Sequence, residues 1–327
     1  MEKTIDIIVE SGQEDTRLDT FISRRMGVTR SSAAHAVDEG RVLVDGRTRR
    51  PSFRLKPGMR VQAGIAGEKP PRTGLKARDI PLDVLYEDEH IIVLDKPAGL
   101  VVHPGAGEHE ATLAHAILHR YPETAGLGTP ERPGIVHRLD KLTSGVMVVA
   151  RSGGAYDALV TSFKEHRHTR VYRAVCYGRM GEEHGRIETF MDRHPKDRKK
   201  MSSRVAQGRR AVTDWAVIRQ WDQFSLLELT LKTGRTHQIR VHLADTGHPV
   251  AGDPEYGGKR RANTITDPVV RSRVKGLGRQ MLHAWKLGIT HPATGQWMEF
   301  TSEIPEDMKS LIALLDERTK AKGKVGI

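Results

Sequence analysis

The stretch at residues 134–151 reads GIVHRLDKLTSGVMVVAR. Its second half contains the apolar run VMVV, and its first half is a tight polar segment with one acid, Asp140. A short apolar run bounded by turn residues predicts a buried strand. The acid lies between two cations, Arg138 and Lys141, directly before that strand. The sequence therefore predicts a single carboxylate held at the entrance of a core strand.

Further strand-like runs lie on both sides of this stretch and are bounded by Gly, Pro and polar turns. They are IIVLDKPAG (91–99), VYRAVCYG (171–178), TDWAVIRQ (213–220), SLLELTLKTG (225–234), KLGITHP (286–292) and QWMEFTSEIP (296–305). Several are joined by short connections, which favours antiparallel pairing. Helical patterns interrupt them at about 111–120, 155–165 and 236–246. This mixture predicts an α+β fold, with a mainly antiparallel mixed sheet flanked by helices over residues 81–312.

A smaller α+β module is predicted at residues 14–66. The segment TRLDTFISRRMG (16–27) has a helical period and places four apolar side chains on one face: Leu18, Phe21, Ile22 and Met26. A second short helix is expected in VTRSSAAHAVDEG (28–40), ended by Gly40. A strand and an Asp45–Gly46 hairpin turn follow in RVLVDGR, and another turn and strand in LKPGMRVQA.

The module is rich in arginine and has few nearby acids. Its arginines are Arg24, Arg25, Arg30, Arg41, Arg47, Arg49 and Arg50. Such a run can be a solvated face, but this density favours RNA binding. The Pro- and Gly-rich segment 67–80 is predicted to be a linker. Residues 313–327 are expected to form a basic tail, frayed over ERTKAKGKVGI.

Composition limits the function classes. The chain has 327 residues and a formal net charge of +12, which indicates a polyanionic partner, either nucleic acid or anionic lipid. It has no run of about 18 apolar residues that predicts a membrane span, and its polar, acidic N-terminus does not resemble a signal peptide. The lone cysteine, Cys176, lies in an apolar run and is expected to fill the core. A cytoplasmic protein is therefore expected.

Several kinds of catalytic site are disfavoured by the motifs. His115 and His119 have zincin spacing, but Ala116 stands where the zincin glutamate would be. His237 and His242 are five apart and lie on different faces of a helix. No CxxC pair, P-loop, GxGxxG or GxSxG motif is present in a suitable context. We therefore do not expect a metal.

A second polar stretch gives Asp140 a catalytic interpretation. An isolated Asp before a strand is more often a turn-capping residue than a catalytic one. In KTGRTHQIRVHLADTGHPVAGDPEYGG (232–258), however, Thr236 is predicted to cap a helix that carries Arg240 and ends before Gly247. Arg235 lies beside the predicted cap. Two arginine-bearing segments and one acid on a basic scaffold suggest an anion-binding site with a carboxylate that acts as nucleophile or base.

Four motifs follow one another along the chain: LDKPAGLVVHPG (94–105), HRLDKLTSG (137–145), GRTHQIRVHLADTGHPVAGDPEYGG (234–258) and LHAWKLGITHPATG (282–295). Together they resemble the RluA-type pseudouridine synthases. The similarity covers residues 81–305, and the N-terminal module resembles a small RNA-binding domain shared by a ribosomal small-subunit protein and tyrosyl-tRNA synthetases. The layout is most similar to the branch that acts on large-subunit ribosomal RNA.

The resemblance implies roles for individual residues. Asp140 corresponds to the catalytic aspartate and Arg240 to the basic residue paired with it. Tyr172 corresponds to the tyrosine that stacks on the uracil, and Arg138 to the arginine that fills the space left by the flipped base. Further substrate-binding residues are expected to be Lys141, Arg235 and His237.

The implied reaction converts uridine to pseudouridine without a cofactor. Asp140 would attack the anomeric carbon or abstract a ribose proton, and the sequence leaves both open. The expected partner is ribosomal RNA, bound by a monomer. Two alternatives remain at this point: a synthase that acts on transfer RNA, and a catalytically silent RNA-binding protein of ribosome assembly.

Overall fold

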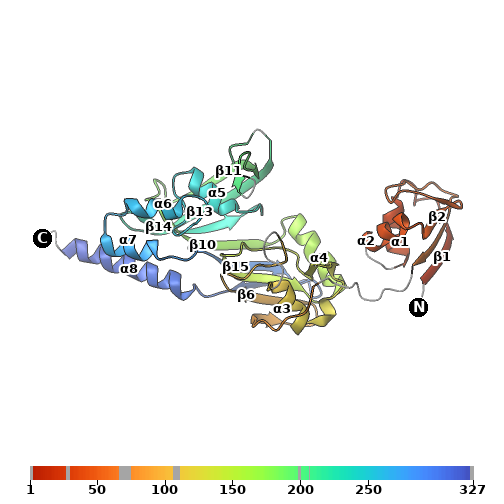
Figure 1. Cartoon of the computed structure of the whole chain (residues 1–327), viewed down its shortest axis with the longest axis horizontal. Helices are drawn as coiled ribbons and strands as arrows, with labels where there is room; N and C mark the ends of the chain where they lie inside the picture. The colour runs from red at the N-terminus through yellow and green to blue at the C-terminus, as the bar shows by residue number, and fades with distance from the viewer. Residues whose placement is uncertain are drawn as a thin grey trace. The chain divides into compact units, whose positions relative to one another are not determined.

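The chain forms two compact units, Met1–Pro71 and Arg72–Ile327, in a computed structural model (Figure 1). The structure describes residues 3–26, 30–65, 75–105, 111–197, 200–205 and 207–324. Each unit has its own cluster of buried apolar side chains. Each unit is therefore a domain with a separate core.

The N-terminal unit packs two helices against a small antiparallel sheet with strand order β1-β4-β2-β3. The helices are α1 (Leu18–Met26) and α2 (Arg30–Asp38). The strands are β1 (Lys3–Ile8), β2 (Val42–Val44), β3 (Arg47–Thr48) and β4 (Arg60–Ile65). The apolar face predicted for the first helix is confirmed, because all four of its side chains are buried.

The hairpin turn of this unit also matches its prediction. Asp45 and Gly46 have φ angles of 52° and 72°, as a type I′ turn requires. The predicted start at residue 14 is too late, because β1 pairs with β4 along its whole length. Of the predicted linker, residues 67–74 lie outside the described residues. Leu75 is already buried in the core of the second unit.

The second unit is built on a ten-stranded mixed sheet with order β12-β11-β13-β14-β10-β15-β9-β6-β5, in which β16 also pairs with β15. Its strands are β5 (Asp83–Glu87), β6 (Ile91–Lys96), β9 (Ser144–Ala150), β10 (Thr169–Tyr177), β11 (His184–Arg193), β12 (Met201–Ser202), β13 (Arg209–Gln220), β14 (Phe224–Leu231), β15 (Leu282–Thr290) and β16 (Trp297–Thr301). Only β9 and β15 are parallel among the pairs in the described residues. The predicted fold class is confirmed.

Helices surround this sheet. Figure 1 shows α3 and α4 beside the part that contains β6 and β15, and α5 to α8 toward the part that contains β13 and β14. The helices are α3 (Leu113–Arg120), α4 (Gly153–Lys164), α5 (Gln238–Asp245), α6 (Gly258–Arg261), α7 (Pro268–Lys275) and α8 (Glu306–Lys324). Short elements complete the unit: 3-10 turns η1 (Pro122–Thr124) and η2 (Ala262–Thr264), and the hairpin β7 (Gly128–Thr129) and β8 (Arg132–Pro133).

Strand β9 is buried along its entire length, which explains its unbroken apolar sequence. Met147 and Val149 belong to the cluster that includes α3, whereas Val146 and Val148 pack with the cluster that includes α4. Gly145 lies where β9 meets β15 and has a φ angle of 119°. A Cβ there would overlap the carbonyl oxygen of Ala284. The strand that follows Asp140 is thus fixed on both faces.

The expected frayed tail is wrong for residues 313–324, which continue α8. Leu315 on this helix is 4% exposed and belongs to the main core. Asp316 accepts a hydrogen bond from Trp221 Nε1 at 2.9 Å and contacts Arg219. The helix was not predicted because its sequence is rich in charged residues and its few apolar residues bury only one narrow face.

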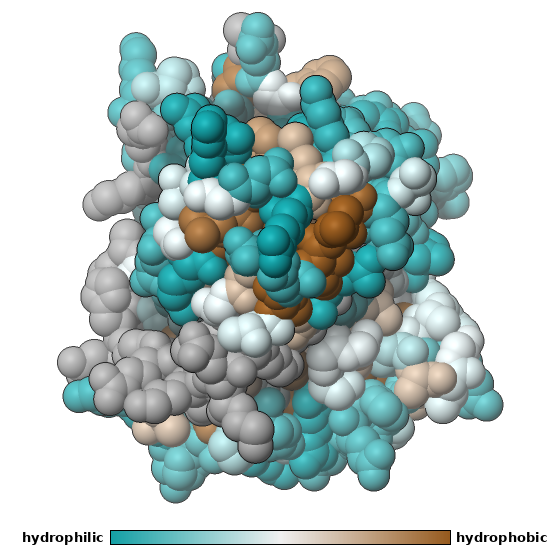
Figure 2. All heavy atoms as spheres, turned by 90° about the vertical axis from the view of Figure 1, so that its right-hand side faces the viewer, coloured by the Kyte–Doolittle hydropathy of each residue, from teal (hydrophilic) through white to brown (hydrophobic). Residues whose placement is uncertain are grey.

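The coloured part of the face shown in Figure 2 is mainly polar. Hydrophilic side chains cover most of the face shown in Figure 2, and hydrophobic ones form small patches between them. Within the described residues, every helix is too short or too polar to cross a bilayer. Cys176 is fully buried, as predicted, and burial raises its thiol pKa to about 12.

We expect Leu315→Ala to lower the free energy of unfolding of the second unit by about 2–5 kcal/mol, because it leaves a cavity under α8. Glu317→Ala, at an exposed position on the same helix, should change it by less than about 0.5 kcal/mol. Urea unfolding followed by tryptophan fluorescence measures both. Equal effects of the two substitutions would show that α8 does not pack as described.

Candidate active site

The loop before β9 holds Asp140 in a defined position. Thr143 N–H donates to the Asp140 carbonyl oxygen at 3.0 Å, which closes a turn at this point. Gly99 N–H donates to the Lys141 carbonyl oxygen at 2.8 Å, which ties the turn to the 97–100 segment. Gln280 donates a side-chain N–H to Thr143 Oγ1 at 3.2 Å. The turn is therefore held by backbone and side chains of two distant segments.

A buried lysine links the same two loops. Lys96, at the end of β6, is fully buried, and its ammonium donates to the carbonyl oxygens of Pro97, Leu100 and Lys141 at 2.7, 2.9 and 3.3 Å. Burial lowers its pKa to about 7, while the charge of Asp140 acts in the opposite direction. Lys96 therefore positions the turn through three backbone carbonyls.

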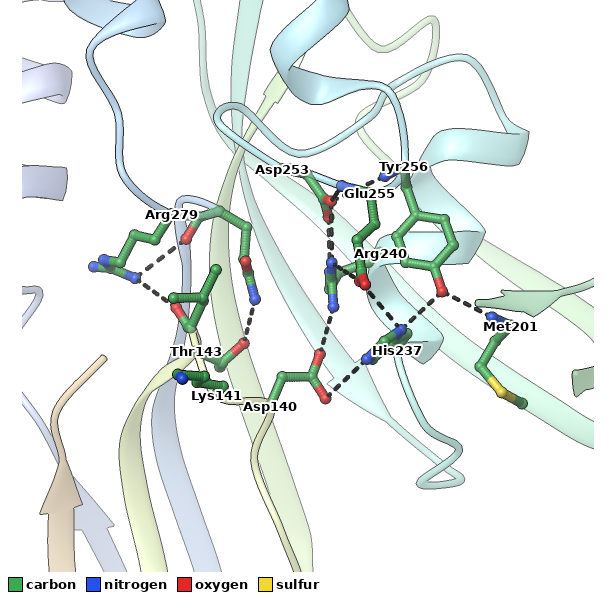
Figure 3. Close-up of polar contacts among 12 residues, drawn as sticks. Asp140, Lys141, Thr143, Met201, His237, Arg240, Asp253, Glu255, Tyr256 and Arg279 are labelled. Atoms are coloured by element: carbon green, nitrogen blue, oxygen red, sulfur yellow. Dashed lines mark hydrogen bonds and ion pairs between the residues drawn. The ribbon is translucent and has the colours of Figure 1, made fainter. Parts of the chain in front are cut away.

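Helix α5 starts one residue later than the N-cap prediction implies. The N-cap is His237 rather than Thr236, with a left-handed backbone (φ 56°) and no side-chain capping bond. Gln238 ties the helix start to the loop before it, because its Oε1 accepts from Arg235 N–H at 3.0 Å and from Thr233 Oγ1 at 2.8 Å. The predicted stop is confirmed by Gly247, which follows the helix with a φ angle of 86°. This start directs His237 toward the turn of Asp140 (Figure 3).

Arg240 on α5 joins three carboxylates (Figure 3). Its guanidinium donates to Asp253 at 2.7 and 3.1 Å, to Glu255 at 2.6 Å and to Asp140 Oδ2 at 3.1 Å. Burial alone disfavours its charge, but the hydrogen bond with Asp253 and the three negative charges raise the pKa of Arg240. The predicted Arg240–Asp140 pair therefore exists geometrically, within a larger buried network.

His237 lies on the other side of the same carboxylate. Its Nε2 is 3.9 Å from Asp140 Oδ1, and its Nδ1 is 2.8 Å from the Tyr256 hydroxyl. Met201 N–H donates to that hydroxyl at 2.9 Å. Burial lowers the pKa of His237. With a neutral ring, the Tyr256 hydroxyl can donate to Nδ1, which leaves the ring proton on Nε2 facing Asp140.

Asp140, His237 and Arg240 border an open cleft. Tyr172 on β10 contributes to its wall and is 7% exposed, and burial raises its pKa. Six of the seven residues singled out in the sequence line this cleft: Arg138, Asp140, Tyr172, Arg235, His237 and Arg240. The seventh, Lys141, has an exposed side chain that is not part of the lining. Its carbonyl oxygen helps to fix the turn.

Sequence reasoning assigned no role to Lys96, Asp253, Glu255 or Tyr256. Asp253 is fully buried and also accepts from Glu255 N–H at 2.8 Å and Tyr256 N–H at 3.0 Å. The available signal was the acidic run GDPEYGG after the helix, and the lysine in LDKPAG. The described residues contain no group of three His, Cys, Asp or Glu side chains placed to hold a metal ion.

Comparison with known proteins identifies the class. A family model described as RNA pseudouridylate synthase matches residues 90–245, and an S4 domain model matches residues 16–61. A solved structure of human RNA pseudouridylate synthase domain containing 1 is 25% identical with a TM-score of 0.53, and covers 72% of this chain and 95% of its own. Two bacterial pseudouridine synthases are at least 40% identical to this chain over most of its length. The chain therefore belongs to the RNA pseudouridine synthase family and is an enzyme of that class.

The particular relatives share one name. Ribosomal large subunit pseudouridine synthase D of Xanthomonas campestris pv. campestris is 43% identical over 289 residues, which is 88% of this chain and 85% of that protein. The protein of the same name from Pseudomonas aeruginosa is 40% identical over 293 residues, 90% of this chain and 89% of its own. The similarity thus includes both units.

Lys96→Met tests whether burial lowers the pKa of the Lys96 ammonium in the folded protein. Between about pH 7 and the ordinary lysine pKa of 10.5, the unfolded chain binds a proton that the folded chain releases. The free energy of unfolding of the wild type should therefore rise with pH relative to the variant, by up to about 1.4 kcal/mol per pH unit. Urea unfolding at pH 7, 8 and 9 measures this. Lys275→Met, exposed on α7, is the control, and parallel profiles for wild type and Lys96→Met would contradict the prediction.

Proposed function

We propose that this enzyme isomerises uridines of large-subunit ribosomal RNA, with Asp140 as the reacting carboxylate. The observation that carries the proposal is the placement of one carboxylate, Asp140, in a cleft that several arginines and the Tyr172 ring also line. One oxygen of Asp140 accepts from Arg240 and the other faces His237, so both oxygens have defined directions. With 18% of the side chain exposed, the carboxylate remains accessible from the cleft.

The reaction needs one positioned group and no redox partner. It breaks the bond from N1 of uracil to the anomeric carbon, turns the base and joins C5 to the same carbon. The proton lost from C5 is balanced by the one that N1 gains. Asp140 can start this sequence as a nucleophile at the anomeric carbon or as a base for a ribose proton. We propose that the chain performs it as a cytoplasmic monomer without a cofactor.

The target uridine must leave its stack before it can reach Asp140, at a cost of a few kcal/mol. The Tyr172 ring in the cleft wall is suited to stack on the extruded base, which is worth about 1–3 kcal/mol. Arg138 is exposed at the cleft and belongs to the same loop as Asp140, so its side chain can enter the space that the base leaves. Arg235 and His237 complete the substrate side of the proposed site.

Large-subunit ribosomal RNA is the proposed substrate for two reasons. The relatives named above are called ribosomal large subunit pseudouridine synthases, and the chain matches them over both units. The N-terminal unit matches the S4 domain model and exposes Arg47 and Arg50. We propose that this unit adds affinity for a large structured RNA, while the cleft selects the base.

The full-length protein should convert uridines in unmodified large-subunit ribosomal RNA and leave transfer RNA unchanged. Asp140→Asn keeps the size but removes the charge, so it should reduce turnover to below about a thousandth of wild type, about 4 kcal/mol of barrier. Its RNA affinity should stay within a few-fold. Pseudouridine mapping of transcribed RNAs after incubation measures turnover. Modification of transfer RNA alone would refute the substrate class. Turnover by Asp140→Asn above about a thousandth of the wild-type rate would refute the role of the carboxylate.

Arg47→Gln with Arg50→Gln tests the N-terminal unit in the full chain. If both arginines contact phosphates, the slope of log affinity against log salt should become shallower by about 0.7–0.9 for each. The modified uridines should not change, because the cleft is intact. The matched control, Arg260→Gln with Lys275→Gln, removes the same charge from exposed positions of the second unit. Equal slopes for the two double variants would mean that the arginine-rich face is merely solvated.

A further inference from the structure

Arg170 has no role in the site described so far, yet it lines the same cleft. It lies on β10 two residues before Tyr172, and alternate residues of a strand point to the same face. The side chain is half-buried, and its Nε is buried without a hydrogen-bond partner. A buried donor left unpaired is unfavourable for stability. Arg170 therefore has unused hydrogen-bonding capacity beside the proposed reaction centre.

Its surroundings lack a balancing charge. Within the described parts of the chain, no carboxylate lies within ion-pair distance of Arg170 or Arg235. By contrast, Arg240 contacts three carboxylates, and Arg173, on the other face of β10, has Glu228 at 3.9 Å. Burial lowers the pKa of Arg170, and the nearby charge of Arg235 lowers it further. Arg170 and Arg235 thus both line the cleft without an acid within ion-pair distance in the described residues.

Neutral groups hold Arg170 in place. Its guanidinium lies over the Phe163 ring at 6.0 Å, and Phe163 stacks between His137 and His168, with ring centroids 4.6 and 4.2 Å apart. Burial, with the charge of Arg170 as a second cause, lowers the pKa of His137 to about 3 and that of His168 to about 4. Both imidazoles are therefore neutral near pH 7. The stack supports the guanidinium without adding or cancelling charge.

Glycine at position 234 makes room for this arrangement. A Cβ built on Gly234 would overlap Arg170 Nη1, so even alanine would displace the guanidinium. Gly234 directly precedes Arg235 in the loop that leads to α5. The loop that brings His237 to Asp140 therefore also accommodates Arg170.

We propose that Arg170, with Arg235 as a second cation, binds a backbone phosphate of the nucleotide that enters the cleft. This inference rests on the proposed site, because it assumes that the base of that nucleotide lies against Tyr172. Two residues along a strand span about 7 Å, which is comparable to the separation between a base and its own phosphate. A guanidinium can bind two phosphate oxygens at once, which fixes the ribose as well as the charge.

The first test is equilibrium binding of the shortest large-subunit RNA hairpin that the wild-type enzyme modifies. It is measured in the Asp140→Asn background, so that turnover does not interfere. Arg170→Gln should weaken binding about ten- to a hundred-fold and make the salt slope shallower by about 0.7–0.9. Arg173→Gln is the matched control, since it removes the same charge from the opposite face of the same strand. An unchanged slope for Arg170→Gln, or an equal change in both variants, overturns the proposal.

The second test replaces one phosphate of the hairpin by a neutral methylphosphonate, at the linkage on either side of the target nucleotide. At one linkage, the substitution should weaken binding by the protein that retains Arg170 about ten-fold. It should cause almost no further loss of affinity in Arg170→Gln, which already lacks the contact. Such non-additivity identifies a direct pair. Additive losses at both linkages overturn the proposal.

Two further variants separate charge from geometry. Arg170→Lys keeps the charge but not the two-pronged contact, so it should restore the salt slope and only part of the affinity. Gly234→Ala keeps the arginine but displaces it, and should resemble Arg170→Gln in the methylphosphonate test. These binding results do not depend on chemistry, so an active Asp140→Asn enzyme would refute the catalytic role of Asp140 without deciding the role of Arg170.

Discussion

The buried charge network around Arg240 is the interaction on which the rest of the site depends. One guanidinium joins the turn before β9, helix α5 and the loop after it, through Asp140, Asp253 and Glu255. Removing one partner from a buried network leaves an uncompensated charge, which is strongly destabilising. The same contacts that orient the Asp140 carboxylate therefore also hold three segments of the second unit together. Fold and site share this constraint.

The cations of the cleft divide into two groups with different surroundings. Arg240 is saturated by carboxylates, whereas Arg170 and Arg235 face the cleft without an acid within ion-pair distance in the described residues. The turn of Asp140 is held from behind by Lys96, whose ammonium contacts backbone carbonyls rather than acids. Among the described residues that line the cleft, Asp140 is the only acid, and its position is fixed by rigid elements. This arrangement suits a polyanionic substrate, whose phosphates can balance the free cations.

Local patterns were sufficient for many elements. The apolar runs at 146–149 and 225–231 became core strands, and the face that begins at Leu18 became α1, because period and turn residues act within a few positions. Exposed or charge-rich elements gave weaker signals. Strand β11 alternates mostly between exposed and half-buried positions, and α8 buries only a narrow face, so neither stood out. Asp140 and Arg240 were found because their motifs also resemble a known family.

The fold class, the two-unit organisation and the family could be predicted from the sequence, because composition, periodicity and ordered motifs are local properties of the chain. Which groups meet in space depends on the tertiary structure. Arg240 is 100 positions from Asp140, and Lys96 is 45 positions from the carbonyl of Lys141 that it contacts. The roles of Asp253 and Arg170, and the exclusion of the Lys141 side chain from the cleft lining, follow from such long-range packing. No local pattern carries that information, because burial and charge balance arise only when distant segments are brought together.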